Sequence, residues 1–313
     1  MIAASLPAAG LQAQGIPLDA EGARRLVAAH RDGPLVIDAA LLDEAAAAEC
    51  AGFTGDLAVD RLETLSPAVA RALAGHRGPL SLSGLRSLTP EAARELSRHE
   101  SILWLAGLAV LSPKAATAIA GHRGPLVLDG LVVLSPAAAR MLAGHAHWLS
   151  LAGLETVDPP LAAELSRHNG PLSLDGLLRL APESAEYLAR LKHPLSLGGL
   201  VALPPATASA LGAHRALISL PRLETLSAET AAALAVHQGG LALPAVRRIS
   251  YDGLAALCGG LDQRATESLP FMAGEPPPAQ PSSAGSASPR PEPPRTSSGP
   301  AGSRSPAAST SDR

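Results

Sequence analysis

The segment Leu80-Ser-Leu-Ser-Gly-Leu85 decides the fold, because the same pattern returns along the chain at a fixed step. Equivalent segments begin every 23 residues, at Leu57, Leu80, Leu103, Leu126, Leu149, Leu172, Leu195, Ile218 and Leu241. Nine starts in a row without an insertion indicate a structural repeat. The chain is therefore predicted to fold as a stack of identical units, each of which buries its core against its neighbours.

Each unit begins with a short strand. The pattern L-x-L-x-G-L alternates apolar and other residues, which is typical of a strand with one buried face. Strands are expected near 57–61, 80–84, 103–107, 126–130, 149–153, 172–176, 195–199, 218–222 and 241–245. A glycine follows in most units and is predicted to permit a tight bend. These glycines are Gly84, Gly107, Gly130, Gly153, Gly176 and Gly199.

A helix of about ten residues is predicted in the second half of each unit. Pairs such as Ser66-Pro67 and Thr89-Pro90 place a capping hydroxyl before a proline at the first helical position. One column is alanine throughout, at Ala70, Ala93, Ala116, Ala139, Ala162, Ala185, Ala208 and Ala231. A leucine or isoleucine follows three residues later, so that the two columns form the buried stripe of a short helix.

Stacking these units predicts an α/β solenoid, with a parallel sheet on one face and short helices on the other. The strand–helix–strand connections are expected to be right-handed. The pattern resembles the leucine-rich repeat family, whose units are 20–29 residues long, over roughly residues 34–262. It departs from the family where Asn or Cys commonly follows the strand, because this chain has leucine there. The resemblance implies a divergent bacterial-type member and recognition of another macromolecule, chiefly a protein.

Four regions are predicted along the chain. Residues 1–33 are expected to supply an N-terminal capping helix, and residues 34–262 the solenoid. Residues 263–273 are expected to form a C-terminal cap. Residues 274–313 are rich in Pro, Ser, Gly, Ala and Arg, and are predicted to be a disordered tail.

Composition disfavours several classes of function. The net charge of −3 argues against a nucleic-acid binder, and no apolar run is long enough to span a membrane. No basic segment typical of a signal peptide precedes the first repeats, which favours a cytoplasmic protein. Motifs for a nucleophile, a phosphate loop or a zinc site were not found, so catalytic residues, cofactors and metals are not expected. The protein is expected to be a monomer.

The strand residues that point away from the helices are the candidate ligand-binding site. With Trp104 as a possible anchor, the predicted site comprises Trp104, Val127, Asp129, Ser150, Ser173, Asp175, Ser196 and Ser219. A smooth solvated face of small residues without a ligand is an equally good interpretation of this row.

A histidine ends most of the predicted helices, at His76, His99, His122, His145, His168, His214 and His237. One interpretation is a metal or proton-relay ladder, because stacked imidazoles would lie about 5 Å apart. The favoured one is structural, since the row lacks converging carboxylates and Leu191 replaces histidine in one unit. We expect buried, neutral imidazoles whose pKa values lie below the unfolded value.

Two functions remain open from the sequence. The first is a non-enzymatic scaffold that binds a protein, or another macromolecule, through the sheet face. The second is a structural or assembly protein that acts through the ends of the solenoid or through its C-terminal tail.

Overall fold

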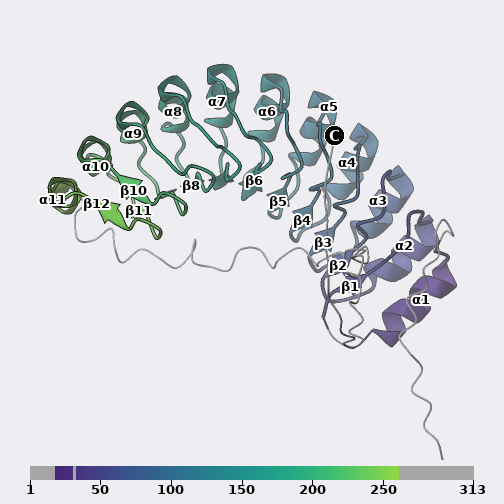
Figure 1. Cartoon of the computed structure of the whole chain (residues 1–313). Helices are drawn as coiled ribbons and strands as arrows, with labels where there is room; N and C mark the ends of the chain where they lie inside the picture. Colours follow the sequence, from purple (N-terminus) through teal and green to yellow (C-terminus); the bar gives the residue numbers. More distant parts are fainter. Residues whose placement is uncertain (1–17, 31–32, 261–313) are drawn as a thin grey trace, which may run out of the picture. The chain divides into compact units, whose positions relative to one another are not determined.

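The computed structural model describes residues 18–30 and 33–260, and these residues form a regular stack of strand–turn–helix units (Figure 1). Figure 1 shows the helices along one side of the stack and the strands along the other. The predicted α/β solenoid of leucine-rich-repeat type is therefore confirmed. Among the described residues, no helix is long and apolar enough to cross a membrane.

Ten parallel strands form one continuous sheet in the order β1-β2-β3-β4-β5-β6-β7-β8-β9-β11. The register repeats without a slip, since Leu57 pairs with Leu80 and Leu80 with Leu103. The strands are β1 Leu35–Val36, β2 Leu57–Ala58, β3 Leu80–Ser81, β4 Leu103–Trp104, β5 Leu126–Val127, β6 Leu149–Ser150, β7 Leu172–Ser173, β8 Leu195–Ser196, β9 Ile218–Ser219 and β11 Leu241–Ala242.

The helices follow the strands one by one, and most are two turns long. Their bounds are α1 Ala20–Ala29, α2 Glu44–Ala51, α3 Pro67–Leu73, α4 Pro90–Leu96, α5 Pro113–Ile119, α6 Pro136–Leu142, α7 Pro159–Leu165, α8 Pro182–Leu188, α9 Pro205–Leu211, α10 Ala228–Ala235 and α11 Tyr251–Gly260. The predicted caps are confirmed: Ser66 Oγ accepts from Val69 N and Thr89 Oγ1 from Ala92 N, both at 3.2 Å. Each cap satisfies one backbone N–H that the first turn leaves without a helical partner.

The strands are shorter than the sequence predicted, with two paired residues in place of about five. Leu80 N donates to Ile102 O and Leu82 N to Trp104 O, and there the ladder ends. Leu85 N then donates back to Leu82 O at 3.1 Å, which turns the chain out of the sheet. The early turn is why a strand pattern of six residues yields so short a strand.

The glycine after each strand has a different role from the predicted one. Gly33 is the only described glycine with a positive φ, so the bend does not require left-handed backbone. A Cβ atom on Gly84 would instead lie 1.9 Å from Asp60 O, and one on Gly130 would lie 1.9 Å from Ala106 O. Because these contacts are with backbone, glycine is required for the close approach of adjacent units.

The alanine and leucine columns form the core, as the sequence predicted. All eight alanines of the column are fully buried, and Leu73, Leu96 and Ile119 beside them are fully buried as well. The core is one continuous hydrophobic cluster that reaches from Ala23 in α1 to Leu257 in α11. Small residues on the helix allow it to lie close to the sheet, and leucine fills each layer.

The two ends of the described chain are less regular. At the N-terminal end α1 lies beside α2, and Leu18 N donates to Leu41 O. At the C-terminal end two short strands that the sequence did not predict, β10 (Thr225–Leu226) and β12 (Arg248–Ile249), pair in parallel beside α10 and α11. The predicted C-terminal cap 263–273 and tail 274–313 lie outside the described residues.

We expect Gly130→Ala to destabilise the fold by several kcal/mol, in the manner of an overpacked core, because the added methyl group would meet a backbone oxygen. Gly144→Ala is the matched control, because its Cβ would lie at an ordinary 3.4 Å from the nearest atom, Met141 O. In urea unfolding, the free energy of unfolding of the control should differ from that of the parent by no more than about 0.5 kcal/mol. Equal stability of the two variants would contradict the close-approach role of the glycine column.

Ala139→Leu should destabilise the protein by about 1–3 kcal/mol, because the alanine is fully buried between helix and sheet. Ala137→Leu, at an exposed position of the same helix, provides the control. Chemical denaturation of the two variants measures the difference. A neutral result for Ala139→Leu would show that the column tolerates a larger side chain.

Candidate binding face and the buried histidine row

The predicted site residues lie in two adjacent columns on the sheet face that points away from the core. The first column follows the strand ladder, in which Trp104 is paired with Val127 and Ser150 with Ser173. The remaining members, Ser196 and Ser219, continue the same line through β8 and β9. The structure therefore brings the predicted residues together as one continuous row.

Most side chains of this first column are more buried than a solvated face would be. Trp104 is 3% exposed and Val127 is 2% exposed. Neither belongs to the hydrophobic core cluster, although both are buried. These two side chains therefore form a small apolar site on the opposite side of the sheet from the core, in β4 and β5.

The aspartates of the second column link successive units through hydrogen bonds. Asp129 Oδ1 accepts from Ser150 Oγ at 2.5 Å and from Ala152 N at 2.9 Å, both in the next unit. Asp175 Oδ1 accepts in the same way from Ser196 Oγ and from Gly198 N. Such charge-assisted bonds satisfy a backbone N–H just beyond the end of the strand ladder.

A third carboxylate, Asp60, makes the same pair of bonds with Ser81 Oγ and Ser83 N. Spacing explains all three sites, because the donor hydroxyl lies 21 residues after the aspartate and the donor N–H lies 23 residues after it. Among the described residues, Asp60 and Asp129 use only Oδ1 in these bonds. Asp175 is itself exposed, so the row presents carboxylate to solvent beside the buried hydroxyls.

A second set of buried hydroxyls was not recognised in the sequence. Ser184 Oγ donates to Val157 O, Thr207 Oγ1 to Leu180 O and Thr230 Oγ1 to Leu203 O, at 2.8–3.0 Å. Each hydroxyl reaches the connecting loop of the preceding unit. The signal was available, because Ser and Thr replace Ala or Leu in one helix column of the last three full units, always 27 residues after the acceptor.

The histidine row forms a stack of parallel imidazole rings. Ring centroids are 6.2 Å apart for His76 and His99, 5.8 Å for His99 and His122, and 6.1 Å for His122 and His145. His145 and His168 continue the stack at 6.1 Å. These rings are 0–3% exposed, so the predicted buried ladder is confirmed.

Leu191 interrupts the ladder and is itself buried. Beyond it His214 and His237 stack at 5.9 Å. The rings face backbone carbonyl groups at their edges: His237 Nε2 lies 3.1 Å from Ala216 O, and His168 Nε2 lies 3.2 Å from His147 O. His168 and His237 thus bridge the turns of adjacent units, whereas neither ring nitrogen of His99, His122, His145 or His214 has a hydrogen-bond partner among the described residues.

Burial lowers the pKa of six histidines of the row. The pKa of His122 is lowered to about 4, chiefly by desolvation and to a smaller extent by His99 and His145. The pKa of His168 is likewise lowered to about 4, chiefly by desolvation, with a smaller effect from His145. Desolvation also lowers the pKa values of His99, His145, His214 and His237. These six rings are therefore neutral at pH 7.

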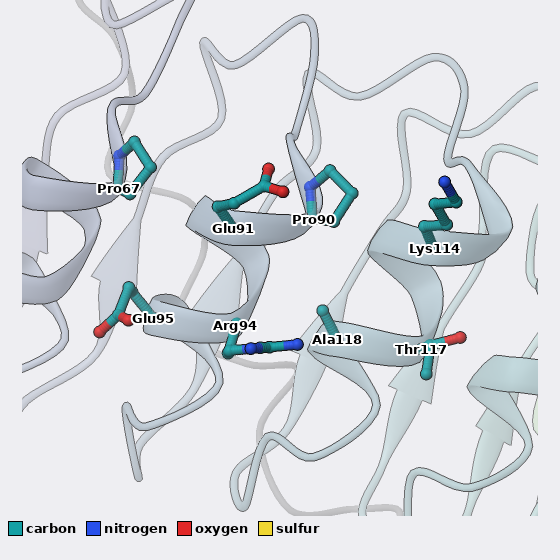
Figure 2. Close-up of a pocket in the computed structure, with 8 residues that line it drawn as sticks. All are labelled: Pro67, Pro90, Glu91, Arg94, Glu95, Lys114, Thr117 and Ala118. Carbon is teal, nitrogen blue, oxygen red and sulfur yellow. The ribbon is translucent and has the colours of Figure 1, made fainter.

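The helix side of the solenoid carries an open hollow between α3, α4 and α5 (Figure 2). Figure 2 shows that Arg94 extends toward Ala118, while Glu95 points the opposite way and Lys114 points away from both. Charges of both signs line the hollow, but they do not converge on a common point. This arrangement is typical of a solvated surface rather than of a small-molecule site.

Within residues 18–30 and 33–260, no three side chains of His, Cys, Asp or Glu converge in a way that could hold a metal ion. Among the histidines, the stacked geometry explains why, because each ring lies over its neighbours instead of pointing at a shared centre. Cys50 is fully buried, and burial raises the pKa of its thiol to about 11, so the thiolate form is disfavoured at neutral pH.

No protein-family model matches the chain, and no curated protein is similar to it in sequence. Among solved structures, the chain is similar to a leucine-rich repeat protein of Leptospira interrogans. The two are 12% identical, with a TM-score of 0.21, over 75% of this chain and 87% of that one. The assignment to the leucine-rich-repeat type of solenoid therefore depends on the repeat geometry described above.

The buried imidazoles predict that acid destabilises the protein. The unfolded chain binds protons at about pH 6.5, whereas His122 and His168 bind them only near pH 4 in the folded state. Stability is therefore complete above pH 6.5 and is lost as the pH falls through the window from 6.5 to about 4. At pH 5 the loss should be about 2 kcal/mol for each of these two histidines.

Urea unfolding at pH 5, 6 and 8 measures how the free energy of unfolding depends on pH. The parent is compared with a variant that carries Gln at His99, His122 and His145. The variant should lose much of the pH dependence between 8 and 5, whereas His30→Gln, at a half-buried histidine outside the row, should retain it. A parent that is as stable at pH 5 as at pH 8 would contradict a neutral buried ladder.

Proposed function

We propose that this protein is a non-enzymatic scaffold that binds another protein through the sheet face, at Trp104, Val127, Asp129, Ser150, Ser173, Asp175, Ser196 and Ser219. The observation that carries the proposal is the continuous row of carboxylates and small hydroxyl side chains beside Trp104 and Val127. Such a surface is built on a rigid sheet whose register does not vary. Solenoids of this type commonly act as interaction scaffolds.

The chemistry of the row indicates what kind of partner surface it fits. Asp60, Asp129 and Asp175 place three carboxylates along one line, and small residues lie between them. Each uses Oδ1 to accept two bonds from the next unit, so the second oxygen, Oδ2, is the one that can accept further bonds. A partner that presents Lys or Arg side chains at matching intervals would form charge-assisted hydrogen bonds with these groups.

Trp104 and Val127 support the binding face rather than contact the partner, because they are 3% and 2% exposed. We propose that they hold the neighbouring strands rigid beneath the more exposed carboxylates, of which Asp129 lies two residues beyond Val127. A basic protein segment would match these carboxylates, whereas the phosphates of a nucleic acid would be repelled by them.

The test removes the charges and keeps the hydrogen bonds. Asp129→Asn combined with Asp175→Asn retains an acceptor oxygen for Ser150, Ala152, Ser196 and Gly198, so the fold should survive. The parent should retain a partner protein from a cell extract. We expect the double variant to retain at least about tenfold less of that protein, which corresponds to about 1.4 kcal/mol of binding free energy. Quantitative mass spectrometry of the retained proteins measures the difference.

Glu91→Gln combined with Glu183→Gln is the matched control, because it removes two exposed carboxylates from the helix side. The control should retain the partner at the level of the parent. If the parent and both double variants retain the same proteins in the same amounts, the sheet face is not the binding surface.

A further inference from the structure

One edge of the solenoid exposes an unusual number of large apolar side chains. Ten large apolar residues are exposed in the described chain, and six of them lie in the loops that lead from strand to helix. These six are Leu41, Val110, Val132, Val133, Leu178 and Val201, at 54–66% exposure. Five of them follow strands β4, β5, β7 and β8, and this clustering on both sides of the β6 unit indicates a surface feature rather than scattered exposure.

The loops that carry them form two parallel columns along this edge. The first, here called the edge row, consists of Glu63, Arg86, Ala109, Val132, Glu155, Leu178, Val201, Glu224 and Arg247, all exposed. The second is Thr64, Ser87, Val110, Val133, Thr156, Arg179, Ala202, Thr225 and Arg248, also exposed. Backbone bonds join successive loops, since Arg86 N donates to Glu63 O and Arg247 N to Glu224 O.

The edge row has a pattern that is complementary to its own reverse. From its N-terminal end it runs acid, base, apolar, apolar, acid, apolar, apolar, acid, base. When the same row is placed against it in the opposite direction, acid faces base at both ends and apolar faces apolar in between. Because each unit is related to the next by the same step, a reversed copy of the row has the same spacing.

We propose that this edge is the interface of a symmetric, antiparallel homodimer with its twofold axis at Glu155. Glu63 of one copy then faces Arg247 of the other, and Arg86 faces Glu224. Between them Ala109 faces Val201. In the innermost layer on each side of the axis Val132 faces Leu178. Because the interface is isologous, every one of these contacts occurs twice.

The pattern selects a single register. A shift by one unit in one direction places Arg86 against Arg247 and Glu155 against Leu178. A shift in the other direction places Glu63 against Glu224 and Glu155 against Val132. Both shifts bring like charges together and bury a carboxylate against an apolar side chain, which costs affinity. Only the central register pairs opposite charges at both ends and apolar groups between them, and its one mismatch in the edge row is Glu155 against Glu155 at the axis.

The twofold axis itself brings two Glu155 carboxylates together, which is unfavourable. Arg179 of the adjacent unit lies in the second column, one layer away from each carboxylate, and partly offsets the repulsion. The interface is also small, because it uses two columns of loop residues. Small interfaces are weak and transient, so we expect dimerisation at micromolar or higher concentrations.

This inference is independent of the proposed sheet-face function, because the edge row and the sheet face are different surfaces. It replaces the sequence-based expectation of a monomer. A dimer formed through the edge leaves the row of Asp129 and Asp175 available in both copies. Two identical binding faces in one assembly would strengthen the capture of a partner with repeated sites.

The first test is sedimentation velocity of the full chain from about 5 to about 500 µM, where a small interface should associate. Val132→Asp should weaken dimerisation at least tenfold. Val236→Asp is the matched control, because Val236 is 64% exposed and Val132 63%, but Val236 ends α10 and is not in the edge row. Glu155→Gln should strengthen the dimer, since it removes the repulsion at the axis.

The second test uses the end pairs. Arg247→Glu and Glu63→Arg should each weaken dimerisation when studied alone, because each places like charges opposite one another. An equimolar mixture of the two variants should regain the parent association, since both pairs between positions 63 and 247 in the mixed dimer are again of opposite charge. Circular dichroism confirms that each variant is folded.

A parent that remains monomeric over the whole concentration range overturns the proposal. The proposal is also overturned if Val132→Asp and Val236→Asp weaken dimerisation equally, because the interface would then not lie at the edge row. If the mixture of charge variants associates no better than either variant alone, the antiparallel pairing is wrong.

Discussion

The close approach of successive units is the constraint on which the rest of this structure depends. Parallel strands joined in strict register bring the backbone of each unit so near to the preceding one that a Cβ at Gly84 or Gly130 would overlap a carbonyl oxygen. Alanine in the facing helices meets the same requirement on the other side of the core. A single spacing thus determines which columns must be small and which can be leucine.

The same spacing brings side chains at one position of each unit into contact with the next unit, so that they form continuous rows. Imidazoles at one position of most units stack about 6 Å apart, and burial keeps rings such as His122 neutral. Carboxylates such as Asp129 reach a hydroxyl and a backbone N–H of the next unit. In the last units the hydroxyls of Ser184 and Thr207 reach back to a loop carbonyl. The aspartate and hydroxyl ladders satisfy polar groups that stacking would otherwise bury without partners, whereas both ring nitrogens of His99, His122, His145 and His214 have no hydrogen-bond partner among the described residues.

The surfaces left over by this packing are where function can reside. The sheet face combines carboxylates that link successive units with the buried side chains of Trp104 and Val127, so the proposed binding surface is built from groups that also serve the fold. The loop edge is less constrained by packing, because its side chains are exposed and the ion pair that joins adjacent units there, Glu63 with Arg86, is also exposed. Its residues therefore vary from unit to unit. This variation lets the edge distinguish one unit from another, which the nearly identical core columns do not.

The sequence by itself determined the repeat, the order of strand and helix, the caps at Ser66 and Thr89, and the burial of the histidine row, because each follows from a local pattern repeated at one step. It also identified the residues of the sheet face. Only the tertiary structure decided that the strands stop after two pairs, that glycine is needed for backbone proximity, and that Asp129 bonds to the next unit. Those features depend on distances between units, which no single unit encodes.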